Sequence, residues 1–348
     1  MELSISILIT PWPQRPNAYC LLAAMHLAYY QEMQYTQSNR LVRLLSACFF
    51  FLRLGAVYVA GTSIVIAQEL EPRTFANTPT GVNIFSAGYA YSSGNVLLDP
   101  TLPIEDLDGK LNIGLIGYGR TFGLFNRNAK LKVFVPYAFG DWKGEFEGAA
   151  AEREAQGFGD IRLKLEWNFF GAPALNGKQF QSYQQKTIVG TSVMIVAPTS
   201  DYNSDELLNL GSNRWAVRTE LGVSRAIGSW TLELIGNVWW FGSNNNFVGG
   251  NKLEQDPLYV AKGHLIYSFR PGLWVGFGLG YGRGGQSQVN GVPRATEQEN
   301  FRFGLSAAYP INKQHGLVGS FTRAQNSGAG AEFDVFSLRY QYAWGGDK

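Results

Sequence analysis

Residues 159 to 170, with the sequence GDIRLKLEWNFF, decide the fold. Every second residue from Ile161 to Phe169 is apolar, whereas Arg162, Lys164 and Glu166 lie between them. Side chains of a β-strand alternate between its two faces, so this segment has one apolar and one charged face. A helix would spread both classes around its circumference. A single strand of this kind also fits a soluble sandwich, but many long ones with Trp and Tyr near their ends indicate a transmembrane barrel.

The same alternation recurs along the chain, and twelve segments fit it. They are approximately 83–92, 110–122, 130–139, 159–170, 187–197, 214–224, 230–241, 259–270, 273–281, 300–309, 315–322 and 333–344. Their connections alternate between long and short, except for a medium connector around Asn176. Bacterial outer-membrane barrels have an even strand number, short periplasmic turns and long extracellular loops. We therefore predict an all-β, antiparallel, up-and-down transmembrane barrel of about 12 strands in the outer membrane of a Gram-negative bacterium.

The N-terminal region has the composition of a targeting sequence. Arg40 and Arg43 precede a mostly apolar run that ends in Val65-Ile66-Ala67, which fits a signal peptidase site. We expect cleavage after Ala67, with a membrane anchor as the alternative. The predicted divisions are an extension and signal peptide at 1–67, an irregular segment at 68–82 and the barrel at 83–348. Beyond this region no uninterrupted apolar run reaches about 18 residues, so transmembrane helices are not indicated.

Composition excludes several classes of function. Both cysteines, Cys20 and Cys48, precede the predicted cleavage site, so the mature chain would have no disulfide, catalytic thiol or thiolate metal site. A formal net charge of +2 over 348 residues gives no footprint for nucleic acid. His264 and His315 would be the remaining histidines, and neither stands beside a serine or in a G-x-S-x-G motif. We therefore predict no catalytic residue, no metal site and no cofactor.

The polar faces of the predicted strands collect charged residues that we expect to line the lumen. These are Arg120, Lys132, Arg162, Lys164, Glu166, Arg214, Arg218, Glu220, Lys262, His264 and Arg302. One interpretation is that cations and carboxylates of neighbouring strands pair, which keeps buried charges satisfied. The other is an electropositive channel that attracts anionic solutes such as aromatic carboxylates, since basic pore linings favour anions. In that case Arg162, Arg214 and Arg218 are the first candidates to orient an anionic group.

Glycines occupy every second position from Gly276 to Gly282, opposite Val275, Phe277 and Leu279. Such a row on the lumen face leaves space for something bulky. The occupant is an inward aromatic side chain, the N-terminal segment or a ligand. Glycine also permits strong curvature of the strand.

Several motifs resemble one family. They are PTGVN at 79–83, GFGD at 157–160, GAPAL at 171–175, NLGSNRW at 209–215 and EQDPLY at 254–259. Across about residues 77–345 the chain resembles the outer-membrane transporter family named for the meta-cleavage (MetA) pathway of phenol degradation. The resemblance implies an outer-membrane barrel associated with uptake of small, often aromatic, organic compounds. It supplies no catalytic residues. Alternating aromatic and apolar residues from Phe336 to Trp344 also fit the C-terminal strand pattern that the barrel-assembly machinery favours.

The predicted function is therefore passive uptake of small organic, aromatic or anionic compounds through an outer-membrane channel. The expected partners are outer-membrane lipid, a small-molecule solute and the barrel-assembly machinery, without nucleic acid. A structural or surface-binding barrel, whose loops carry the function, is the alternative. An outer-membrane lipid hydrolase is a third interpretation.

Overall fold

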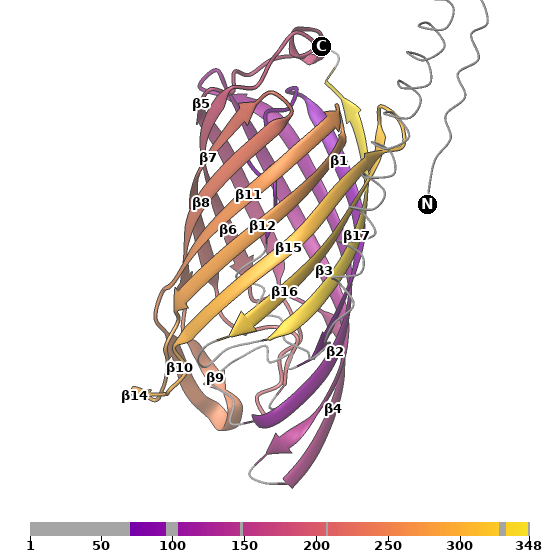
Figure 1. Cartoon of the computed structure of the whole chain (residues 1–348). Coiled ribbons are helices and arrows are strands. Elements are labelled where there is room, and N and C mark those ends of the chain that lie inside the picture. The colour runs from indigo at the N-terminus through magenta and orange to yellow at the C-terminus, as the bar shows by residue number, and fades with distance from the viewer. Residues whose placement is uncertain (1–69, 95–103, 147–148, 207, 327–331, 347–348) are drawn as a thin grey trace, which may run out of the picture. The chain divides into compact units, whose positions relative to one another are not determined.

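Twelve of the described strands close into one antiparallel barrel (Figure 1). The computed structural model describes residues 70–94, 104–146, 149–206, 208–326 and 332–346. The predicted signal peptide lies outside these residues. Each strand pairs with the next along the barrel, and the last strand pairs with the first in register from Val82↔Gly345 to Gly94↔Phe333. Within the described ranges, no helix is long and apolar enough to cross a bilayer.

The barrel strands follow the predicted order. They are β1 (Val82–Gly94), β2 (Ile104–Leu124), β3 (Arg127–Phe146), β5 (Ile161–Phe170), β6 (Thr187–Ala197), β7 (Ala216–Ile227), β8 (Trp230–Phe241), β11 (Leu258–Arg270), β12 (Leu273–Gly284), β15 (Gln298–Pro310), β16 (His315–Asn326) and β17 (Phe333–Gly345). The predicted fold, an antiparallel barrel of twelve strands, is confirmed. β2 and β3 extend well beyond their predicted bounds, whereas the bounds of β6 and β8 match the prediction to the residue.

The connection predicted between residues 139 and 159 is largely strand. Residues 141–146 form the far end of β3, and a further strand, β4 (Ala149–Phe158), pairs with it. The Ala-rich sequence of β4 lacks the alternation that marks the other strands. β4 and β5 follow one another along β3, and the pairing shifts by one residue between Tyr137↔Phe158 and Phe134↔Arg162. Pro136 lies at this bulge, and its carbonyl accepts a hydrogen bond from the Gly159 N–H at 3.0 Å.

The exposure of β5 is the reverse of that in a soluble protein. Lys164, Glu166 and Asn168 are each 2% exposed, whereas Leu163 and Leu165 are 43% and 39% exposed. The charged face therefore points into the barrel and the apolar face points outward. An apolar outer surface on a closed barrel faces lipid rather than water. This places the protein in the outer membrane.

The two ends of the barrel differ. At one end the strands are joined by tight turns, such as Phe125-Asn126, where both residues adopt left-handed backbone angles (φ 48° and 57°). The connector 171–186 at this end contains the short helix α2 (Gly177–Phe180). The Leu175 carbonyl of this connector accepts a hydrogen bond from the Thr80 N–H at 2.8 Å. Its Gly177 N–H donates a hydrogen bond to the Gly346 carbonyl, also at 2.8 Å. The connector thus holds both ends of the barrel chain. By the rule for outer-membrane barrels, this is the periplasmic end.

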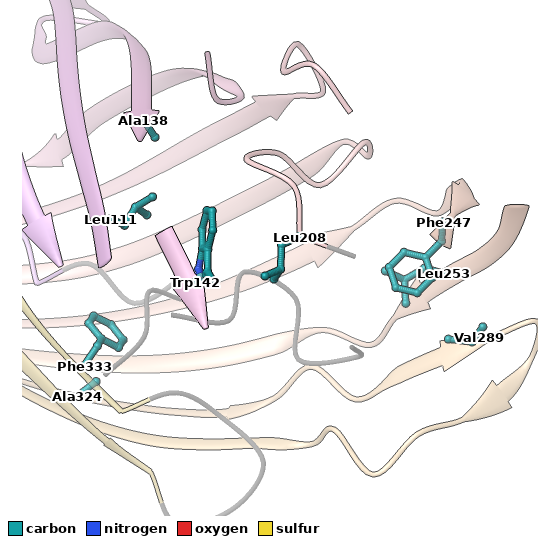
Figure 2. Packing of buried hydrophobic residues seen from close by; sticks show 9 residues of the cluster. All are labelled: Leu111, Ala138, Trp142, Leu208, Phe247, Leu253, Val289, Ala324 and Phe333. Atoms are coloured by element: carbon teal, nitrogen blue, oxygen red, sulfur yellow. The ribbon is translucent and has the colours of Figure 1, made fainter. Parts of the chain in front are cut away.

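Long loops fold over the opposite end. Two of them supply a small sheet of β9 (Asn244–Phe247), β10 (Asn251–Gln255), β13 (Ser287–Val289) and β14 (Val292–Pro293), and the turn η2 (Val248–Gly250) joins β9 to β10. Figure 2 shows the buried apolar cluster that joins this sheet to the barrel rim. Its largest members are Trp142 from β3, Phe247 from β9 and Phe333 from β17. Leu208, from the connection between β6 and β7, packs with them.

Candidate functional site

The chain preceding β1 lies inside the barrel at its periplasmic end. Phe75 is 1% exposed and packs with Ile188 and Ile235. Its ring lies against Gly190 and Gly222, which are paired across β6 and β7. A Cβ on Gly190 would come within 2.4 Å of Phe75 Cδ1, and one on Gly222 within 2.3 Å of Cε2. The two glycines therefore make the space that the ring fills.

The glycine row of β12 accommodates the same N-terminal segment. A Cβ on Gly278 would lie 3.6 Å from a Leu70 methyl carbon, and one on Gly280 would lie 3.1 Å from the other. The N-terminal segment therefore lies next to both glycines, and the inward His264 ring also faces Gly278, with Cδ2 at 2.9 Å from such a Cβ. Gly276 instead faces Ile266, Ser306 and Trp274.

A network of ion pairs surrounds the segment. Glu166 accepts from Lys132 at 2.7 Å and from Lys164 at 3.0 Å, and Lys164 also reaches Glu71 of the N-terminal segment at 3.2 Å. Glu220 continues the network and pairs with Lys262 at 2.9 Å and Arg218 at 3.4 Å. Lys164, Glu166, Arg218, Glu220 and Lys262 are almost fully buried, whereas the side chains of Lys132 and Glu71 are about one-fifth exposed. Burying a charged group is costly unless an opposite charge lies beside it. In this network each buried carboxylate of the lower lumen is paired with cations, which offsets that cost.

Glu71 is the point where the segment joins the network. Burial alone would raise the pKa of its carboxyl group. The ammonium groups of Lys164 and Lys132 outweigh this effect and hold the pKa of Glu71 well below its usual range. Backbone contacts add to the attachment: Lys130 donates to the Thr74 carbonyl at 2.9 Å, and the Arg73 N–H donates to Glu233 at 2.8 Å.

The structure brings most of the predicted lumen residues to the inward face. Besides the network above, Arg162, Arg214, His264 and Arg302 point into the barrel. Arg120 is a correction, because it is exposed on the outward face that carries Ile116 and Tyr118. Both faces of β2 are largely apolar, so alternation did not reveal which one points inward. Leu111, 2% exposed, marks the inward face.

Above the N-terminal segment lies a cavity of about 420 Å³. Its apolar wall includes Leu111, Ile113, Leu210, Trp239, Phe241 and Phe333. Arg162, Arg214, Arg302 and Arg339 also line it. Two of these guanidinium groups lie over aromatic rings, Arg214 at 5.0 Å from the centre of Phe241 and Arg302 at 4.5 Å from that of Phe333. Arginine stacks on aromatic faces in this way because the ring face is electron-rich.

The cavity lining contains two carboxylates among the described residues, Glu71 and Asp160. Asp160 accepts backbone N–H groups from Thr199 at 3.1 Å, Ser200 at 3.2 Å and Ser212 at 3.1 Å. It thereby fastens the loop between β6 and β7 over the bulge at Gly159. Neither Glu71 nor Asp160 was selected from the sequence. The signal for Asp160 was its place in the GFGD motif, whereas the segment around Glu71 has no local pattern.

Among the described residues, neither His264 nor His315 is hydrogen-bonded to a serine. Nδ1 of His264 lies 3.5 Å from Glu233, and neither ring nitrogen has a hydrogen-bond partner among the described residues. His315 shares a hydrogen bond with the Tyr340 hydroxyl. In the same part of the chain, no three His, Cys, Asp or Glu side chains gather as metal ligands.

Comparison with known proteins agrees with the fold and the motifs. The model of a family described as "Putative MetA-pathway of phenol degradation" matches residues 60–340. The chain belongs to this family. No curated protein shows significant sequence similarity to it. Among solved structures, an outer membrane channel from Pseudomonas putida F1 has a TM-score of 0.66 and 24% identity, over 79% of this chain and 100% of that one.

More remote barrels are also similar. The β-domain of the Bordetella autotransporter BrkA has a TM-score of 0.46 and 12% identity, over 76% of this chain and 100% of that one. The transport unit of the autotransporter AIDA-I from Escherichia coli has a TM-score of 0.45 and 11% identity, over 79% of this chain and 92% of that one. At these identities the similarity concerns the barrel fold.

Proposed function

We propose that this family member is an outer-membrane channel for passive uptake of small organic compounds, aromatic or anionic, along their concentration gradient. The cavity of about 420 Å³ carries the proposal. Small-molecule sites typically have volumes of about 300–1,000 Å³ and are largely apolar with a few placed polar groups. The mixture of aromatic rings and guanidinium groups fits this description. The family's association with phenol degradation supports an aromatic solute.

The cavity lies between two closures. The loop-end cluster around Trp142 and Phe333 covers it on one side, and the N-terminal segment around Phe75 lies on the other. A solute would pass the loops, reside in the cavity and leave after the N-terminal segment moves. The similar barrel from P. putida is described as an outer membrane channel, which supports the same role here.

Flux through proteoliposomes tests this proposal. The full chain would be reconstituted, and entry of labelled phenol would be measured against protein-free vesicles. Ile113 lines the cavity, whereas Ile116, three residues along the same strand, is 59% exposed on the outward face. Ile113→Trp should reduce flux by filling the cavity, and the matched variant Ile116→Trp should leave it unchanged. Equal flux in both variants and in protein-free vesicles would refute the proposal.

A surface-binding role is the second candidate. The observation that favours it is the ordered sheet of β9, β10, β13 and β14 at the loop end. Replacing residues 288–293 by a short glycine linker separates the two functions. Loss of ligand or partner binding with unchanged phenol flux would assign the function to the loops, and the opposite result would assign it to the lumen.

A further inference from the structure

One wall of the cavity combines guanidinium groups with aromatic rings. Arg214, which precedes β7, lines it together with Trp239 and Phe241 of β8. Arg218 of β7 lies behind Trp239, its partner across the two strands, and does not line the cavity. The guanidinium of Arg218 lies 5.3 Å from the centre of the Trp239 ring, and that of Arg214 lies 5.0 Å from the centre of Phe241. We call the three lining residues, Arg214, Trp239 and Phe241, the arginine–aromatic wall.

The two rings of this wall are nearly parallel. Their centroids are 6.2 Å apart with an interplanar angle of 7°. Apolar side chains flank them, including Val196 from β6 and Leu258 from β11. Arg214 is held in place by a 2.6 Å hydrogen bond from its Nη2 to Gln255 of β10. A flat ligand can therefore lie on an apolar surface whose cations are already oriented, which lowers the entropic cost of binding.

Charge is unevenly distributed around this wall. Four guanidinium groups line the cavity, against the carboxylates of Glu71 and Asp160. Glu71 is engaged by Lys164, and Asp160 by the backbone N–H groups of the loop between β6 and β7. Beneath the cavity, Arg218 donates from Nη2 to Glu220 at 3.4 Å, whereas its buried Nε and Nη1 donate no hydrogen bond among the described residues. Buried donors normally have acceptors, so this region is electrostatically suited to a bound anion.

We infer that the arginine–aromatic wall binds an aromatic monocarboxylate, with the ring on the apolar surface and the carboxylate on Arg214. Arg162 faces the same cavity from β5 and supplies a second cation to the anion. A planar guanidinium matches a carboxylate in shape and forms two parallel hydrogen bonds to it. The inference rests on the proposed function, because it names the class of solute that the channel selects.

Calorimetry on the full chain in detergent micelles tests the inference. The probes are benzoate and benzamide, which have nearly the same size and differ in charge. Benzoate should bind more tightly than benzamide. Arg214→Gln should weaken benzoate binding roughly ten- to hundredfold and leave benzamide binding within about twofold. The matched control is Arg225→Gln, because Arg225 lies on the outward face of β7, the strand that follows Arg214, and its loss should not affect either probe.

The outcomes separate this inference from the channel proposal. Equal binding of benzoate and benzamide, or equal loss of both in Arg214→Gln, would overturn the anion inference. If Arg214→Gln fails to form a barrel, Arg162→Gln provides the same comparison. Phenol flux is measured in parallel on the same preparations. Flux without benzoate preference refutes only the wall as an anion site, whereas absence of both flux and binding also refutes the channel.

Discussion

Truncating Phe75 to alanine should release the N-terminal segment from the lumen. The ring is 1% exposed and fills the space above Gly190 and Gly222. Loss of a buried Phe side chain costs about 3–5 kcal/mol, which changes the ratio of docked to released segment by about a hundredfold to a few thousandfold. The remaining hydrogen bonds, such as Asn168 to the Phe75 carbonyl at 3.0 Å, contribute about 1 kcal/mol each. The ring therefore contributes more to docking than any one of these hydrogen bonds.

Single-channel recording in planar bilayers measures the effect. Phe75→Ala should show larger or more frequent conductance steps than the parent chain. Phe125→Ala is the matched control, since Phe125 is 80% exposed on the turn between β2 and β3. The reasoning would be refuted if Phe75→Ala conducted like the parent while retaining the heat-modifiable gel mobility of a folded barrel.

The variant Gly222→Ala should also release the N-terminal segment, which provides an independent check. Gly222→Ala places a Cβ 2.3 Å from Phe75 Cε2, so the ring must shift. In the Phe75→Ala background this clash is absent. The double variant should therefore conduct no more than Phe75→Ala alone. Additive effects would show that Gly222 acts through another neighbour, such as Ile235 at 3.0 Å.

Three further predictions follow from the geometry. Leu234 lies at an outward position and is 68% exposed. Leu234→Arg should lower the free energy of unfolding in lipid, measured by denaturant titration, by about 2–4 kcal/mol. A change within about 0.5 kcal/mol would argue against a lipid-facing surface. Asp160→Ala should free the loop between β6 and β7 and speed its limited proteolysis, whereas Asp160→Asn should retain part of the protection. Because the pKa of Glu71 is lowered from its ordinary value of 4.5, its contribution to docking is fully present above about pH 4.5 and is lost as the pH falls through the lowered pKa. Conductance should therefore rise only below about pH 4.5, and Glu71→Gln should raise it at neutral pH and abolish this part of the pH dependence.

Local alternation was sufficient to predict most of the barrel. β5, β6 and β8 follow their sequence patterns because lipid and lumen demand opposite side chains at successive positions. Where both faces have similar side chains the pattern gives no direction. β2 is apolar on both sides near Leu111 and Ile116, which is why Arg120 was assigned to the wrong face. β4 has alanines in place of alternation, so its strand arises from pairing with β3.

The candidate site depends on contacts that no local pattern contains. Glu71 and Lys164 are 93 residues apart in sequence, and Phe75 lies against glycines more than 100 residues away. The glycine row of β12 indicated that the lumen needed space, and its neighbour Leu70 became apparent only once the strands were placed. Sequence reasoning could identify charged lumen faces, but the pairing partners required the closed barrel.

The basic residues of the lumen serve charge pairing at one depth and line an electropositive cavity at another. Around the N-terminal segment, Glu166 and Glu220 are surrounded by cations at salt-bridge distance, so charge pairing governs that region. Nearer the loops, Arg214 and Arg302 lie over aromatic rings in a cavity whose two carboxylates are already engaged. An anion bound near these arginines would next reach the level of Glu71. The cations there are already paired with carboxylates, such as Lys164 with Glu71. Under the proposed channel function, further passage of the anion would depend on displacing the segment that Phe75 anchors, so selection and release of the solute would be separable by mutation.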